Sequence, residues 1–142
     1  MSVTSALNSA LGKQGLPVTT AISLVVDRSG SMSAYKTNVV NSVTSFINDQ
    51  KELRGSAFFT LAQFDDQYDV VFRDREIKEI DARQFDYSPR GGTCIRDALV
   101  RAVRDMEAFL KGTPAKDQPK RLVVALITDG MDGENENSVE KV

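Results

Sequence analysis

The sequence of 142 residues contains no histidine and only one cysteine, Cys94. Without histidine, the chain cannot form a Ser-His-Asp triad, a Cys-His pair or a zinc site with an imidazole ligand. One cysteine excludes an internal disulfide and suits a reducing compartment, and we interpret Cys94 as a small buried residue. No signal-peptide-like stretch and no apolar run of membrane-spanning length occur. We therefore expect a cytoplasmic protein, or a virion protein if the source is viral.

The sequence also has no large excess of positive or of negative charge. The 18 Lys and Arg residues are nearly balanced by 20 Asp and Glu residues, which gives a net charge of −2. This balance predicts no basic surface for nucleic acid, and we expect no membrane partner. The length suits one domain rather than two.

Two nearly continuous apolar runs, 21–26 and 122–127, each end in a polar turn. Such runs are typical of strands buried on both faces, as in a parallel sheet covered by helices. Between them, the hydrophobic pattern predicts two helices, 35–53 and 95–110, and a hairpin of two strands, 57–64 and 68–72. A hairpin pairs its strands in the antiparallel sense. We therefore predict an α/β sandwich with a mostly parallel sheet and one antiparallel edge strand.

Hard oxygen donors follow the two buried strands and open the second helix: Asp27, Ser29, Ser31, Thr93 and Asp129. Ligands in such sheets bind beyond the carboxyl ends of the strands, so these side chains should gather at one end. Carboxylate and hydroxyl oxygens suit hard divalent cations such as Mg²⁺. Only two of the donors carry a formal charge, which would leave a bound cation electrophilic.

Three motifs occur in order: Asp-x-Ser-x-Ser at 27–31, Gly-Gly-Thr at 91–93 and Thr-Asp-Gly at 128–130. Together they resemble the metal-ion-dependent adhesion site of von Willebrand factor A (vWA) domains, and the resemblance covers about residues 20–135. It implies a Rossmann-like vWA sandwich.

The resemblance also implies a role for each donor. Ser29, Ser31 and Thr93 would contact the cation directly, and Asp27 and Asp129 would act through water. The implied cation is Mg²⁺, with Mn²⁺ or Ca²⁺ as alternatives. We expect these side chains to lie on surface loops that contribute little to stability.

From their content of Ser, Ala, Gly and Asn, we expect residues 1–19 to form an N-terminal arm or a short first helix. By the same resemblance, residues 20–142 form a vWA domain that is incomplete at its C-terminus. The family's sheet continues past Asp129 with further helices and strands, whereas this chain ends at Val142. The strand at 122–127 would then lie at an uncovered edge, and such edges pair with other chains. We expect self-association or a second chain that completes the sheet.

Other residues indicate which members of the family this chain resembles and which side chains lie outside the metal site. Arg28 and the sequence Phe64-Asp65-Asp66 resemble compact bacterial and phage members of the family. We interpret Asp65 and Asp66 as turn residues, and we expect Asp65 to be dispensable for partner binding.

The function that follows is a metal-dependent binding module that engages an Asp or Glu of a partner protein, and not an enzyme. Two alternatives remain open. The chain could be a structural subunit of a larger assembly, such as a virion or a multi-chain complex. A metal-dependent phosphoesterase is the other alternative, although the sequence offers no histidine as a base.

Overall fold

The computed structural model describes residues 20–53 and 55–129. The elements in chain order are β1 (Thr20–Asp27), η1 (Gly30–Tyr35), α2 (Lys36–Glu52), β2 (Ala57–Phe64), β3 (Tyr68–Glu76), η2 (Ile77–Glu79), η3 (Ala82–Gln84), α3 (Ile95–Lys111), η4 (Ala115–Asp117) and β4 (Arg121–Ile127). The sheet has the order β3-β2-β1-β4. β1 is parallel to β2 and β4, and β3 is antiparallel to β2, as the sequence predicted.

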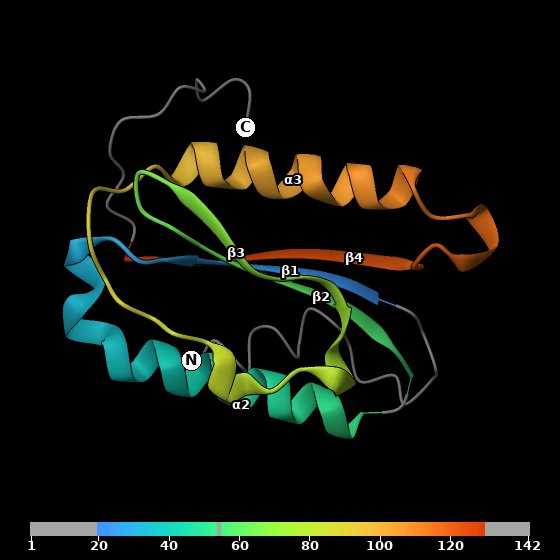
Figure 1. The fold of residues 1–142 in the computed structure, drawn as a ribbon, viewed down its shortest axis with the longest axis horizontal. Helices are drawn as coiled ribbons and strands as arrows, with labels where there is room; N and C mark the ends of the chain where they lie inside the picture. Colours follow the sequence, from blue (N-terminus) through green and yellow to red (C-terminus); the bar gives the residue numbers. More distant parts are fainter. Residues whose placement is uncertain (1–19, 54, 130–142) are drawn as a thin grey trace.

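β1 lies in the middle of the sheet, and all eight of its residues are buried. Its register sets the position of the functional loops, because Val26 pairs with both Gln63 and Ile127. β1, β2 and β4 therefore finish at the same level. Their carboxyl ends, the β2–β3 turn and the start of α3 meet at one end of the molecule, on the left in Figure 1.

The two helices cover opposite faces of the sheet (Figure 1). α2 buries Val39, Val43, Phe46 and Ile47 in the larger apolar cluster, to which the segment around η2 and η3 also contributes. α3 buries small side chains, Ala98 and Ala102, against Val25 and Phe64. The small residues are consistent with close packing of α3 on the sheet.

One strand end differs from the prediction. β3 extends to Glu76, four residues beyond the predicted end at Phe72, and a register shift interrupts its pairing with β2. Two short 3₁₀ turns follow where the sequence predicted a connection. Hydropathy does not mark the extra residues, because side chains of this outer strand such as Arg73 and Arg75 are exposed.

Several expectations fall on residues outside the described ranges. The arm at 1–19 and the incomplete C-terminal part beyond Asp129 stay predictions. Among the described strands β4 pairs only with β1, and Leu122 and Val124 on it are 47% and 38% exposed. Whether another chain covers this edge also stays a prediction. None of the helices within 20–53 and 55–129 has the length and apolar character needed to cross a membrane.

Candidate metal centre

Asp27 is the last residue of β1, and its side chain is completely buried. Its Oδ1 accepts a hydrogen bond of 2.7 Å from the backbone N–H of Ser29, and its Oδ2 accepts one of 2.8 Å from the Thr128 hydroxyl. A buried carboxylate needs such partners because desolvation of a charge is costly. The two bonds join the turn after β1 to the turn after β4.

The two serines of the first turn lie side by side. Ser29 Oγ and Ser31 Oγ are 3.1 Å apart, and either can be the donor of a hydrogen bond. The backbone turns here because η1 begins at Gly30, with a bond of 2.9 Å from the Met32 N–H to the Ser29 carbonyl. Ser29 is buried, whereas Ser31 is exposed. The pair therefore places two hydroxyl oxygens side by side, one on a buried residue and one on an exposed residue of the same turn.

The loop that carries Thr93 is bonded to the first turn through the backbone. The Gly30 N–H donates to the Gly91 carbonyl at 3.1 Å, and the Arg90 N–H donates to the Arg28 carbonyl. Thr93 itself is buried. The backbone bonds bring the third predicted motif residue to the same end of the sheet as the two serines.

Tyr87 is hydrogen-bonded to the last residue of β1, Asp27. Its hydroxyl donates a hydrogen bond to the Asp27 backbone carbonyl. Burial raises the pKa of Tyr87, and the charges of Asp27 and Asp129 raise it further, partly offset by Arg28. The Tyr87 hydroxyl therefore remains a protonated donor at neutral pH. No role was assigned to Tyr87 from the sequence.

The structure thus places all five predicted donors at one end of the sheet, but it corrects one expectation about them. Asp27, Ser29 and Thr93 are buried rather than exposed on surface loops. Removing Asp27 would leave the buried Ser29 N–H without its acceptor, and a buried unsatisfied group costs about 1–3 kcal/mol. The expectation that the donors lie on surface loops was therefore wrong for these three side chains.

The donor set consists of two carboxylates and three hydroxyls. Within the described ranges, no group of three or more His, Cys, Asp or Glu side chains is arranged to hold a metal ion. The chemistry of this set suits a hard cation that accepts hydroxyl and water ligands, such as Mg²⁺. It does not suit zinc, which prefers nitrogen and sulfur ligands.

Asp65 is the residue that sequence reasoning most underestimated. It follows β2 directly and is 2% exposed, so it is not an ordinary turn residue. Its carboxylate accepts a hydrogen bond of 2.9 Å from Arg90 Nε, and its carbonyl accepts one of 3.1 Å from the Cys94 N–H. Burial acts to raise the pKa of Asp65, but bonds from Gln67 and Arg90 and the charges of Arg90 and Arg28 outweigh it. The net result is a lowered pKa.

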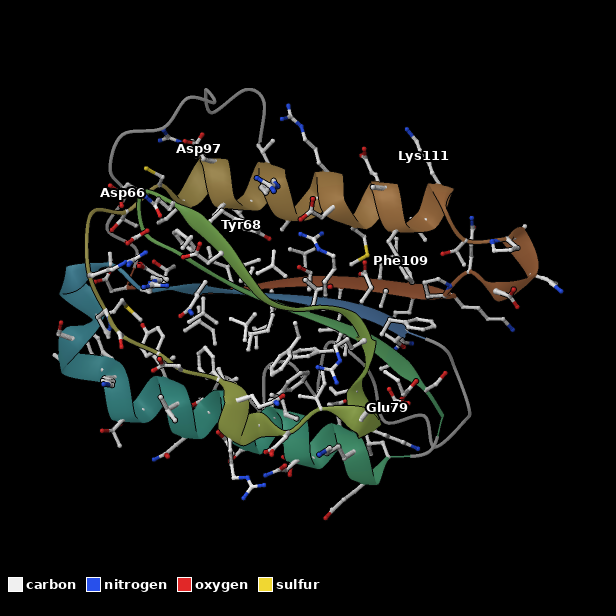
Figure 2. The ribbon with its side chains drawn as sticks, viewed as in Figure 1. Asp66, Tyr68, Glu79, Asp97, Phe109 and Lys111 are labelled. Carbon is white, nitrogen blue, oxygen red and sulfur yellow. The ribbon has the colours of Figure 1, made fainter. Side chains whose placement is uncertain are left out.

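A groove of about 270 Å³ runs between the β2–β3 turn and the first half of α3. Gln67 and Tyr68 line it on one side, and Val100, Arg101 and Arg104 line it on the other. Asp66 and Asp97 also line it, and Figure 2 shows both at the left-hand end of the molecule. The groove is therefore next to the loop that carries Thr93.

Comparisons with known proteins agree with this arrangement. A family model described as "von Willebrand factor type A domain" matches residues 22–131. The fold is similar to a crystal structure of three N-terminal domains of the type V pili tip protein Mfa5 from Porphyromonas gingivalis. That match has a TM-score of 0.58 and 17% identity, and it covers 87% of this chain and 22% of that chain.

A crystal structure of the vWF domain of the same Mfa5 protein also matches. Its TM-score is 0.58 at 16% identity, over 88% of this chain and 44% of that chain. This chain therefore spans less than half the length of either Mfa5 chain. At such identities the likeness is one of fold alone. Among curated proteins, no match was found.

Proposed function

Because this chain belongs to the von Willebrand factor type A domain family, we propose that it is a metal-dependent protein-binding module. Asp27, Ser29, Ser31, Thr93 and Asp129 would hold one divalent cation, Mg²⁺ or alternatively Mn²⁺ or Ca²⁺. When bound, the cation supplies an electrophilic centre to which an Asp or Glu of a partner protein can coordinate. The observation that carries the proposal is the hydrogen bonding that ties the three motif loops together around the buried Asp27 carboxylate.

The spacing of the serine hydroxyls supports this assignment. Adjacent ligands of an octahedral Mg²⁺, each about 2.1 Å from the ion, lie about 3.0 Å apart. The 3.1 Å between Ser29 Oγ and Ser31 Oγ is close to that spacing. The two hydroxyls could therefore occupy neighbouring positions of one coordination shell without a change of backbone.

The charge of the site supports a partner that offers a carboxylate. Asp27 and Asp129 supply two negative charges, which balance a divalent cation without overcompensating it. Nearby, Arg28 and Arg90 are paired with Asp69 and Asp65. An incoming carboxylate would therefore meet no unpaired excess of negative charge from these side chains. The groove beside the loops is lined by charges of both signs, with Arg101 and Arg104 as well as Asp66 and Asp97.

An enzymatic role has less support. Hydrolysis at a bound cation needs a base or nucleophile, and the chain contains no histidine. Tyr87 is held as a donor by its bond to the Asp27 carbonyl, and burial raises its pKa. We therefore infer a binding module and not an enzyme. Turnover of a generic phosphoester that depends on Mg²⁺ and is lost on substitution of Ser31 would contradict this inference.

Thermal unfolding in millimolar Mg²⁺ and in EDTA tests the cation site, because a ligand that binds only the native state stabilises it. At about 100 times its dissociation constant, the cation should add roughly 2.7 kcal/mol. Ser31→Ala should remove this effect and remain folded, because Ser31 is exposed. The matched control is Ser45→Ala, an exposed serine on α2 that should keep it. Identical melting of metal-free wild type under both conditions would rule out the site.

A peptide array tests the partner chemistry. Each peptide that contains Asp or Glu is paired with a twin in which Asn or Gln replaces the acidic residue. Binding that requires Mg²⁺ should be confined to the acidic twin, because only a carboxylate is a strong ligand for the cation. Equal Mg²⁺-dependent binding of both twins would contradict a coordinating carboxylate.

A further inference from the structure

A charged side chain is buried next to the candidate metal centre without being one of its predicted ligands. Asp65 is 2% exposed, and its carboxylate is ionised at neutral pH because its pKa is lowered. Burying a charge is costly unless hydrogen bonds and counter-charges compensate it. The hydrogen bonds of Asp65 all lead to the turn itself or to the loop that carries Thr93.

The two carboxylate oxygens of Asp65 have separate partners. Oδ1 accepts a hydrogen bond of 2.8 Å from the backbone N–H of Gln67, which fixes the carboxylate relative to its own turn. Oδ2 accepts one of 2.9 Å from Arg90 Nε. This second bond is charge-assisted, and such bonds are shorter and stronger than neutral ones. The side chain thus connects the β2–β3 turn to the residue where the Thr93 loop begins.

The Asp65 backbone holds the other end of the same loop. Its carbonyl accepts a hydrogen bond of 3.1 Å from the N–H of Cys94, the residue after Thr93. Thr93 therefore lies between two residues, Arg90 and Cys94, that are both bonded to Asp65. A short segment fixed at both ends has little freedom to move its middle.

Gly91 allows the loop that carries Thr93 to lie close to the β2–β3 turn. A Cβ atom at this position would lie 2.9 Å from Asp65 Oδ2 and 2.9 Å from Asp66 Oδ1. Gly91 also has a φ of +67°, which L side chains adopt at a cost. The loop can rest on the Asp65 carboxylate because glycine occupies this position.

The same network reaches the first motif. Arg90 Nη2 also lies 3.6 Å from Asp69 Oδ2. The same Asp69 oxygen accepts a hydrogen bond of 3.1 Å from Nη1 of the buried Arg28. Arg28 separates two predicted ligands, Asp27 and Ser29. The β2–β3 hairpin, which contains no predicted ligand, is therefore bonded through Asp65 and Asp69 to two of the loops that do.

We propose that Asp65 is a positioning residue that holds Thr93 in the metal site through Arg90, Gly91 and Cys94. The proposal rests on the proposed function and replaces the expectation that Asp65 is dispensable for partner binding. Asp65 acts through Thr93, because its side chain and its carbonyl are bonded to the two ends of the segment that carries Thr93.

The test is a double-mutant cycle of Asp65→Asn and Thr93→Ala, with Mn²⁺ affinity measured by electron paramagnetic resonance. Asn offers one carbonyl oxygen where Asp offers two acceptors, so either Gln67 or Arg90 faces an amide NH₂. Loss of such a supporting contact should lower Mn²⁺ affinity roughly 10-fold. In the Thr93→Ala background, Asp65→Asn should cause almost no further loss, because it acts through the missing side chain. If the double variant loses Mn²⁺ affinity by the product of the two single losses, the two residues act independently, and the proposal is overturned.

Asp66→Asn is the matched control, because it removes the same charge one residue away. Asp66 is exposed and forms no hydrogen bond or ion pair with any residue of the described ranges. Its substitution should change Mn²⁺ affinity less than twofold, whereas a purely long-range charge effect would lower affinity equally in both variants. Equal losses would therefore also overturn the proposal.

Amide hydrogen exchange in EDTA separates this proposal from the proposed function. Asp65→Asn should speed exchange of the Cys94 amide severalfold in metal-free protein, because the loop is held without a cation. If wild type binds no Mn²⁺, the proposed function fails. Unchanged Cys94 exchange would overturn the positioning role on its own. If Asp65→Asn does not fold, Arg90→Ala replaces it in every measurement, since the Arg90 side chain is 53% exposed.

Discussion

The interior between the sheet and α2 and the turns at the carboxyl ends of β1 and β2 both contain buried side chains, but these side chains are stabilised differently. In the interior, aromatic and aliphatic side chains pack without specific pairing, as between Phe46 and Phe59, whose ring centroids are 6.1 Å apart. In the loops, Asp27 and Asp65 form directional hydrogen bonds to particular donors. Under the proposed function, substitutions in the interior should act mainly on stability and substitutions in the loops mainly on cation binding.

The difference also concerns tolerance to substitution. Packing energy is distributed over many weak contacts, so a core accepts changes that conserve volume. A buried hydrogen-bond network loses much of its value when one member is removed, because the remaining partner stays desolvated. Variants in the two regions should therefore separate stability from cation affinity.

The largest expected effect is on stability, from Phe59→Ala. Phe59 is fully buried in the larger cluster, and the cavity should lower the free energy of unfolding by about 3–5 kcal/mol. Urea denaturation in EDTA measures this loss. Phe58→Ala is the control on the opposite face of the same strand, where the side chain is only partly buried against Phe109. It should cost less, and the Mn²⁺ affinity of the folded fraction should stay unchanged in both variants.

The sequence predicted the interior well because packing leaves a periodic record in it. The continuous apolar runs at 21–26 and 122–127 became β1 and β4, and the three-residue turn after Phe64 gave the antiparallel hairpin. The periodicity also placed α2 and α3 to within one residue at most boundaries. Each of these features depends on neighbours in sequence, which is why pattern alone was sufficient.

The site was predicted only in part, because its supporting contacts join residues far apart in sequence. The motif residues were found by their spacing, but Tyr87 donates to a backbone carbonyl 60 residues away, and a carbonyl has no signature in sequence. The Asp65–Arg90 pair spans 25 residues and looks like ordinary surface charge. A glycine pair before Thr93 was the one available signal of a close approach, and it did not indicate which residue would lie against Gly91.

Gly91→Ala should have the next largest effect, and it should affect both properties. The new Cβ would clash with the Asp65 and Asp66 carboxylates, and the positive φ would be strained, at a cost of about 1–3 kcal/mol. Because the loop must shift to relieve the clash, Mn²⁺ affinity should fall as well. Thermal unfolding and Mn²⁺ titration measure the two effects.

Gly92→Ala is the matched control for this variant. A Cβ atom at Gly92 would meet no atom within 4 Å, so the substitution should leave both stability and affinity nearly unchanged. Similar losses in the two variants would mean that the loop tolerates no side chain at all. The contact between Gly91 and Asp65 would then have no special role.

The smallest expected effect concerns the pH dependence of stability, and it comes from a hydroxyl that the network does not include. Tyr87 donates to Asp27, whereas the buried hydroxyl of Tyr68 has no hydrogen-bond partner among the described residues. Burial raises the pKa of Tyr68 to about 12, and Asp105 on α3 adds to the shift, while Arg101 and Arg73 oppose it. At neutral pH, Tyr68→Phe should therefore be nearly neutral, because it removes an unsatisfied group.

Above pH 10 the two proteins should diverge. The ordinary pKa of 10.0 applies to the unfolded chain and the raised value of about 12 to the folded one, so the unfolded state loses this proton first. The contribution of Tyr68 is thus fully present below pH 10 and is lost as the pH rises toward 12, since stability falls wherever the unfolded state binds fewer protons. Tyr68→Phe lacks this loss, so its free energy of unfolding in urea should decline less steeply from pH 9 to pH 11. Parallel declines in wild type and Tyr68→Phe would show that the Tyr68 hydroxyl is hydrated or bonded in solution. The contrast between the bonded Tyr87 and the unbonded Tyr68 would then disappear.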